Sequence, residues 1–195
     1  MKREKINIFY IIISIISLFT YLYFAGGVQA VNMAGSSAQL LVESKMPEAD
    51  RAEFIYQRKK LAIKIILERY NSPMIGEEDT FIQTCRKYSL DCYLLPSIAG
   101  LESTFGRFIW PGSFNPFGWG RGYIMFSSWK EGIDKVGKGL RENYIDKNGL
   151  TTVDGIGIIY SESPTWAQRV NYFIDLMRKE EEKLSLISAN FPVEL

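Results

Sequence analysis

The chain has 195 residues, of which 47% are hydrophobic and 23% are charged, and its formal net charge is +1. These values are typical of a globular protein, and so small a net charge gives no basic field that would attract nucleic acid. The chain contains no histidine, which excludes Ser-His and Cys-His nucleophilic catalysis and removes the commonest zinc ligand. Acid–base chemistry is left to carboxylates, tyrosine, lysine and cysteine, and we expect neither a metal ion nor a cofactor.

The N-terminus has the pattern of a membrane anchor. Residues 1–5 are basic, and the segment 6–24 consists almost entirely of isoleucine, leucine, phenylalanine and tyrosine. An uncharged segment of this length can cross a bilayer as one helix, and the basic start predicts that the rest of the chain lies outside the cytoplasm. Val28-Gln29-Ala30 also resembles a signal-peptidase site. We therefore expect either a single-pass anchor in the cell membrane or a domain secreted after cleavage following Ala30.

Turn signals and composition divide the chain into parts. Gly, Ser and Ala residues after position 30 indicate a flexible spacer, and Pro47 with Glu48 and Asp50 in the next turn begins a helix. We expect that helix to dock on the domain that follows. The predicted parts are a signal anchor (1–30), a spacer (31–46), a docking helix (47–71), a main domain (72–187) and a tail (188–195).

The two cysteines of the chain, Cys85 and Cys92, are separated by seven positions. A disulfide that closes this short loop is expected if the domain is exported, and two buried thiols are the alternative. A catalytic cysteine is disfavoured because no histidine can activate it.

The stretch from residue 94 to residue 120 organises the chain. Leu94, Ile98 and Leu101 fall on one helical face, and Glu102 follows at the end of this helix. The next segment is a loop rich in glycine, proline and aromatic residues. A carboxylate at a helix C-terminus that faces such a wall is desolvated, and both features raise its pKa. A protonated Glu could donate a proton to a glycosidic oxygen, although a surface Glu beside core aromatics is the simpler alternative.

The motifs GLESTFG and NPFGWG resemble those of the lysozyme-like superfamily, closest to bacterial endo-β-N-acetylglucosaminidase domains and lytic transglycosylases. The resemblance extends from about Ser72 to about Met177. It implies a mainly α (α+β) lysozyme-like domain in which Glu102 is the general acid/base and Ser103 is its neighbour in the cleft. It also implies that the loop Asn115 to Gly120 lines the cleft and that Tyr160 faces the acid, although Tyr160 could equally be a core tyrosine at a helix end.

Further elements are predicted after this loop. Residues 123–126 could pair with residues 117–120 as a small β-hairpin beside the cleft, which the resemblance also implies. Ser128 to Glu131 form a capping box for a helix to about Tyr144, whose glycines could permit close packing. A short helix from Thr151 to Tyr160 and a last helix from Ser163-Pro164 follow. Trp129 and Trp166 lie on the apolar stripes of these helices, so we assign them to packing.

We predict substrate-binding roles for Ser103, Asn115, Phe117, Trp119 and Phe126, with Trp110 as a weaker candidate. Glu162 is the candidate second carboxylate, with Asp154 behind it, and each is better explained as a turn or capping acid. A single essential acid, Glu102, is therefore expected.

The expected function is that of a monomeric, membrane-anchored hydrolase or lytic transglycosylase that cleaves β-1,4 bonds between N-acetyl amino sugars, with peptidoglycan as its partner. The alternative is a non-catalytic, membrane-tethered glycan-binding or assembly module of the same fold. An amidase that acts on the peptide stem would lack the zinc ligands that such enzymes use.

Overall fold

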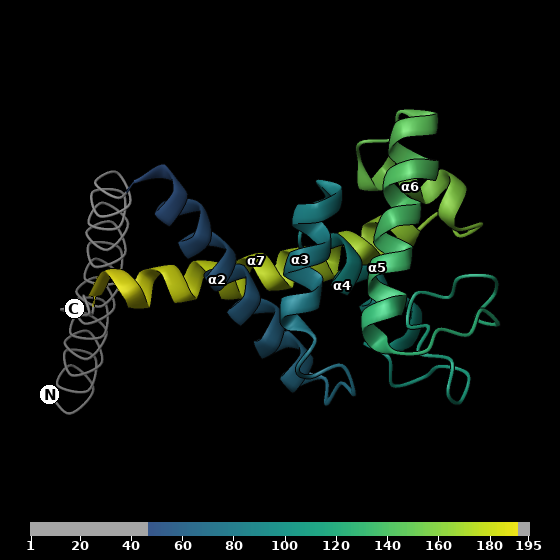
Figure 1. Ribbon diagram of the computed structural model, residues 1–195, viewed down its shortest axis with the longest axis horizontal. Coiled ribbons are helices and arrows are strands. Elements are labelled where there is room, and N and C mark those ends of the chain that lie inside the picture. Colours follow the sequence, from purple (N-terminus) through teal and green to yellow (C-terminus); the bar gives the residue numbers. More distant parts are fainter. Residues whose placement is uncertain (1–46, 191–195) are drawn as a thin grey trace, which may run out of the picture. The chain divides into compact units, whose positions relative to one another are not determined.

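Helices form the whole framework of the part of the chain that the computed structural model describes, residues 47–190, with side chains described through residue 186 (Figure 1). The predicted membrane segment 6–24 and the spacer 31–46 lie outside these residues, as do the last five residues of the tail. No helix within the described range is long and apolar enough to span a membrane. The helices are α2 (Glu48–Arg69), α3 (Glu78–Tyr88), α4 (Leu94–Ser103), α5 (Trp129–Gly139), the π-helix η1 (Leu140–Asp146), α6 (Val153–Tyr160) and α7 (Trp166–Asn190).

Helix α4 lies at the centre of the compact unit that Pro47–Leu184 form. Helix α3 contacts α2, α4 and α5, and α4 also contacts α5. Every residue from Leu94 to Gly100 is buried, which explains why this helix is apolar around its whole circumference. Because its body is fixed on all sides, the residues at its C-terminal end occupy a defined position.

The predicted mainly helical class is confirmed, whereas the predicted β-hairpin is wrong. No residue between 47 and 190 belongs to a β-strand, and Figure 1 shows the segment between α4 and α5 as loops at one end of α5. The reason lies in the residues Gly118, Gly120, Arg121 and Gly122, which all have positive φ. Their backbone closes consecutive tight turns, with bonds of 3.0 Å from the Gly122 N–H to the Gly118 carbonyl and 3.1 Å from the Tyr123 N–H to the Gly120 carbonyl. Extended strands need negative φ.

Helix α5 starts as its sequence predicts, because the Ser128 hydroxyl accepts a hydrogen bond of 3.1 Å from the Glu131 N–H. The expected continuous helix changes into the π-helix η1 at Leu140. The expectation that its glycines permit close packing is confirmed, since Gly132, Gly137 and Gly139 are buried. A Cβ at Gly139 would collide with the Trp119 ring, so this glycine lets the loop before α5 pack directly on the helix.

The last two helices begin slightly later than expected. Helix α6 has Thr152 as its cap, whose hydroxyl accepts a bond of 3.0 Å from the Gly155 N–H. Helix α7 begins at Trp166, because the Ser163-Pro164 segment remains a turn before it. The inner face of α7 consists of buried Trp166, Val170, Ile174 and Met177.

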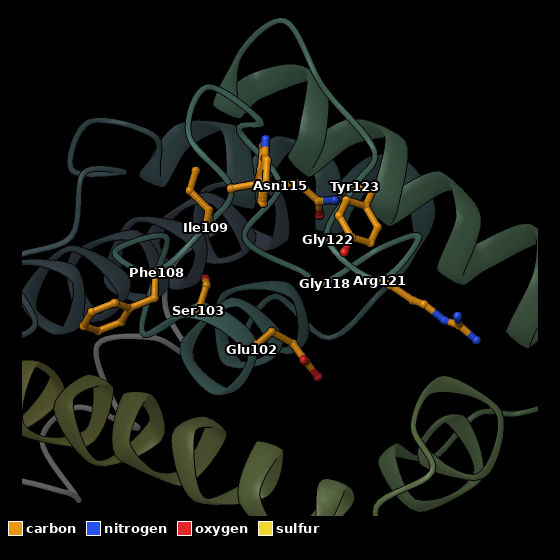
Figure 2. Close-up of a pocket in the computed structure, with 10 residues that line it drawn as sticks. Glu102, Ser103, Phe108, Ile109, Asn115, Gly118, Arg121, Gly122 and Tyr123 are labelled. Carbon is orange, nitrogen blue, oxygen red and sulfur yellow. The ribbon is translucent and has the colours of Figure 1, made fainter.

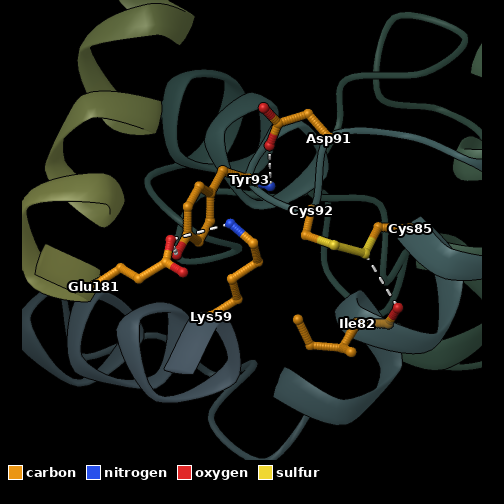
Figure 3. The surroundings of a disulfide bond; sticks show 7 residues. All are labelled: Lys59, Ile82, Cys85, Asp91, Cys92, Tyr93 and Glu181. Atoms are coloured by element: carbon orange, nitrogen blue, oxygen red, sulfur yellow. Dashed lines mark hydrogen bonds and ion pairs between the residues drawn. A yellow bond between two sulfur atoms is a disulfide. The ribbon is translucent and has the colours of Figure 1, made fainter. Parts of the chain in front are cut away.

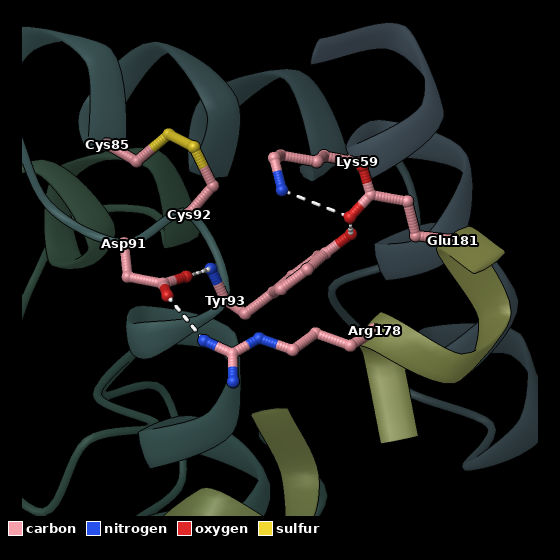
Figure 4. A network of polar contacts seen from close by, with 7 residues as sticks. All are labelled: Lys59, Cys85, Asp91, Cys92, Tyr93, Arg178 and Glu181. Atoms are coloured by element: carbon pink, nitrogen blue, oxygen red, sulfur yellow. Dashed lines mark hydrogen bonds and ion pairs between the residues drawn. A yellow bond between two sulfur atoms is a disulfide. The ribbon is translucent and has the colours of Figure 1, made fainter. Parts of the chain in front are cut away.

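A polar network ties α7 to the start of α4 and to α2 (Figure 4). The buried Tyr93 hydroxyl donates to Glu181 at 2.7 Å, and the Lys59 ammonium pairs with the same carboxylate at 3.0 Å. Arg178 pairs with Asp91 at 3.1 Å, and Asp91 in turn accepts a bond of 2.8 Å from the Tyr93 N–H. Burial raises the pKa of Tyr93, so its hydroxyl remains a proton donor. This network fixes the N-terminal end of α4.

The predicted disulfide is confirmed, because Cys85 and Cys92 are bonded and no free cysteine remains (Figure 3). Cys85 lies in α3, and Cys92 lies just before α4, so the bond closes the turn between the two helices. Both residues are buried, with exposed fractions of 2% and 8%.

Removal of this disulfide is expected to lower the free energy of unfolding by about 2 kcal/mol, because an open loop of this size regains chain entropy in the unfolded state. The measurement is denaturant unfolding of the Cys85→Ala/Cys92→Ala double variant against the unsubstituted protein. The unsubstituted protein in reductant should show a similar loss, and the double variant should not respond to reductant. Equal stability of both proteins would contradict the prediction.

Candidate functional site

Glu102 projects from the C-terminal end of α4 because the helix stops one residue later. Thr104, Phe105 and Gly106 follow with φ values of 51°, 57° and 81°. The N–H groups of Thr104 and Phe105 cap the carbonyls of Gly100 and Ala99 at 3.1 and 2.9 Å. The Phe105 ring folds back over Gly100, where a Cβ would lie only 2.6 Å from a ring carbon. This reversal leaves Glu102 at the edge of the loop that follows.

The Glu102 side chain faces a cavity of about 370 Å³ (Figure 2). Its walls come from the end of α4 and from the loop between α4 and α5. Three of its aromatic rings are strongly exposed, with exposed fractions of 71% for Phe108, 61% for Trp110 and 70% for Tyr123. The Trp110 and Tyr123 rings lie 6.0 Å apart. The full lining is Glu102, Ser103, Phe108, Ile109, Trp110, Asn115, Gly118, Arg121, Gly122 and Tyr123.

The two oxygens of the Glu102 carboxyl group have different surroundings. Oε1 accepts a hydrogen bond of 2.8 Å from the indole Nε1–H of Trp166 in α7. Oε2 has no hydrogen-bond donor within the described part of the chain. It lies 3.2 Å from the position that a Cβ would occupy at Gly118, so the missing side chain at Gly118 leaves room beside this oxygen. Oε2 is therefore the oxygen that can exchange a proton with a ligand.

The pKa of Glu102 is raised, because the surrounding protein removes part of its hydration. The Trp166 hydrogen bond and the positive charge of Arg169 act in the opposite direction and lower this pKa. The expected direction of this shift and its expected cause, desolvation, agree with the structure, although the Glu102 side chain keeps contact with solvent in an open cavity. Its charge state is set by these competing effects rather than by burial alone.

Tyr160 acts on this site through Trp166. The Tyr160 ring stacks on the Trp166 ring at 4.8 Å with an interplanar angle of 29°. Its hydroxyl donates to the Phe117 carbonyl at 2.7 Å. Burial and the nearby Glu102 charge raise the pKa of Tyr160 well above its usual value. The hydroxyl proton is thus committed to the loop backbone, and Tyr160 supports the indole that holds Glu102.

Ser103 and Asn115 line the cavity but direct their polar atoms into the protein. The Ser103 hydroxyl accepts a bond of 2.8 Å from the Gly106 N–H and lies 2.8 Å from the Pro116 carbonyl, to which it can donate. The Asn115 amide donates to the carbonyls of Trp119 and Ile124 at 2.8 and 3.1 Å. Exposed fractions are 4% for Ser103 and 3% for Asn115. Their predicted role as substrate ligands is therefore corrected: they hold the loop in shape.

Not all of the aromatic residues predicted to line sugar subsites lie where a ligand could reach them. Phe117 is fully buried and Phe126 is 9% exposed, so both belong to the core and the prediction of sugar contacts for them is wrong. The Trp119 ring packs against Gly139 and borders a second cavity instead. Residues 115–117 are buried in succession and residues 123–125 are exposed in succession, so the turns between them decide which side chains face outward.

The second cavity has a volume of about 580 Å³ and lies between the same loop and α6. It shares the lining residues Gly118 and Arg121 with the cavity of Glu102, so the two cavities adjoin at these residues. Glu162, the candidate second carboxylate, lines this second cavity and is absent from the lining of the first. The remaining lining consists of Trp119, Gly120, Asn143, Tyr144, Ile158, Ile159, Tyr160 and Ser161.

Comparisons with known proteins gave no significant match to this chain among protein-family models, curated proteins or solved structures. Within residues 47–190 no group of three or more acidic or cysteine side chains is arranged to hold a metal ion. The chemistry of the site is therefore argued from the residues that surround Glu102.

Trp166 and Tyr123 are the site residues that sequence reasoning assigned elsewhere. Trp166 lies on an apolar helical stripe, and periodicity reports only that a residue faces inward, not what its N–H meets. Tyr123 was placed in the predicted hairpin, whereas Gly118 belongs to the loop that was expected to line the cleft. A cluster of glycines around the single Arg121 was the available signal for tight turns.

Substitution Trp166→Phe is expected to raise the pKa of Glu102, because it removes the donor that stabilises the ionised carboxylate while it keeps an aromatic ring under Tyr160. Carboxyl ¹³C NMR titration of Glu102 measures this directly. Trp129→Phe, which changes a partly buried tryptophan that forms no hydrogen bond with Glu102, is the control. An unchanged Glu102 titration in Trp166→Phe would contradict the assigned hydrogen bond.

Proposed function

We propose that this protein cleaves β-1,4 glycosidic bonds between N-acetyl amino sugars, with Glu102 as its general acid. The observation that supports this proposal is an acid with a raised pKa whose Oε2 faces an open cavity walled by exposed aromatic rings. Aromatic faces suit the apolar faces of sugar rings, and a carboxyl group with a raised pKa can be protonated at the pH at which it must act. The resemblance of the E-S-x-x-G and N-P-F-G-W-G motifs to lysozyme-like glycosidases favours the same chemistry.

In this reaction the Oε2 proton of Glu102 passes to the leaving glycosidic oxygen. Glu102 becomes negatively charged as the proton leaves. The Trp166 N–H and the Arg169 charge both favour the ionised form, so they stabilise the charge that develops. Desolvation favours the protonated form of Glu102 before the reaction. The Trp166 N–H and the Arg169 charge lower the free energy needed to transfer this proton.

The second half of the reaction does not need a second carboxylate of the protein. Glu102 is the only acid that lines its cavity. A water molecule would attack C1 directly, or the N-acetyl carbonyl oxygen of the substrate would attack first and form an oxazolinium ion. Water or an internal hydroxyl of the sugar would then open that ion and give its proton to the ionised Glu102, which yields hydrolysis or an anhydro sugar. The two cavities adjoin at Gly118 and Arg121, and this arrangement fits an elongated substrate better than a single sugar.

Peptidoglycan is the proposed substrate, because the N-terminal segment 6–24 is expected to place this domain outside the cell membrane. The disulfide between Cys85 and Cys92 is consistent with such an oxidising location. The proposed polymer thus follows from the proposed localisation, which the disulfide supports.

Glu102→Gln is expected to lower glycan cleavage by about 100-fold or more, because an amide cannot supply the proton. The full chain in detergent is assayed on purified cell-wall glycan, and circular dichroism confirms an intact fold. Glu48→Gln, at an exposed glutamate at the start of α2, is the control and should cleave as the unsubstituted protein does. Full activity of Glu102→Gln would refute the assignment.

A non-catalytic glycan-binding module is the second candidate, favoured by the absence of a second carboxylate from the lining of the Glu102 cavity. The same assay separates the two functions. Binding of the full chain to cell-wall glycan without release of any fragment would identify the binder.

A further inference from the structure

Arg121 lines both cavities, and among the residues that the structure describes it is the only cation in either lining. In Figure 2 its side chain extends from the loop into the open space that the Glu102 carboxylate also faces. Its guanidinium forms no hydrogen bond or ion pair with another described residue, although Glu162 borders the same second cavity. The exposed group thus borders both cavities and is not used to stabilise the fold.

The backbone conformation of Arg121 is energetically unfavourable. Its φ of 57° is left-handed, which is unfavourable for a residue with a Cβ. The flanking Gly120 and Gly122 also have positive φ, and turn hydrogen bonds from Gly122 to Gly118 and Trp119 lock the segment. A non-glycine residue kept in this conformation beside a candidate acid is typical of sites where the structure positions a side chain for a ligand.

The loop that carries Arg121 supplies no carboxylate of its own, although Glu102 lines the first cavity and Glu162 the second. The sequence between Glu102 and Glu131 contains no acidic residue, so no carboxylate of the loop competes for the guanidinium. A planar guanidinium binds a carboxylate through two parallel hydrogen bonds, which a neutral sugar cannot offer.

We propose that Arg121 forms a subsite for a carboxylate carried on a side group of an amino sugar of the substrate. The inference rests on the proposed function, and it identifies the substrate as an acidic glycan rather than a neutral chitin-type polymer. Two sources supply this chemistry: the lactyl carboxylate of glycan strands stripped of peptide, and the carboxylates of peptide stems that remain attached.

The test measures kcat/KM of the full chain on three substrates: peptide-free glycan strands with free lactyl groups, peptide-bearing strands, and neutral N-acetylglucosamine oligomers. Arg121→Gln is expected to lose roughly tenfold or more on an acidic substrate and little on the neutral oligomers, because one charge-assisted bidentate contact is removed. Arg121→Lys, which keeps the charge without the planar fork, should retain part of the activity. Lys147→Gln removes an exposed cation that lines neither cavity and should change nothing.

The acidic substrate that responds to Arg121→Gln identifies the source of the carboxylate. An equal loss on acidic and neutral substrates, or no loss on either, would overturn the inference. Equilibrium binding to the same glycans separates this result from failure of the proposed function. Arg121-dependent binding of acidic glycan without any cleavage supports the subsite and rejects the enzyme, whereas binding that ignores both charge and Arg121 rejects the subsite.

Discussion

The hydrogen bonds of two buried polar side chains, Ser103 and Asn115, hold together the loop on which the candidate site depends. The Ser103 hydroxyl joins the end of α4 to the Pro116 carbonyl, and the Asn115 amide joins the backbone at Trp119 to that at Ile124. These contacts do for the loop what a strand ladder would do for a hairpin, since they satisfy backbone groups that would otherwise be buried without partners. Side chains that looked like ligands therefore act as the internal frame of the cavity.

A second constraint crosses the domain between α4 and α7. The Trp166 indole holds one oxygen of Glu102, the Tyr160 ring stacks on that indole, and the Tyr160 hydroxyl holds the Phe117 carbonyl. The acid, the last two helices and the loop are thus linked through three adjacent contacts. The arrangement fixes the direction of the carboxyl group while its second oxygen stays open beside Gly118. Fixed donors of this kind need no rearrangement when charge develops.

The surroundings of Glu102 balance two requirements, access to its carboxyl group from solvent and retention of its proton. A fully buried acid would hold its proton more firmly, but a polymer could not reach it. An acid in bulk water would be reachable, but it would be ionised near neutral pH. An open cavity with aromatic walls lies between these limits, and Trp166 and Arg169 prevent the proton from being held too tightly.

Local sequence patterns were enough to predict the helical class, the start of α5 at Ser128, the inner face of α7 and the position of Glu102 at a helix end. Each of these depends on local periodicity, on a capping residue or on spacing along the chain, which are readable without neighbours. Only the tertiary structure decided that Phe117 and Phe126 are core residues, that Ser103 and Asn115 bond to backbone, and that the predicted hairpin is a series of turns. It also decided that Trp166 donates to Glu102, because the partner of a buried N–H lies 64 residues away in the chain and leaves no local signal.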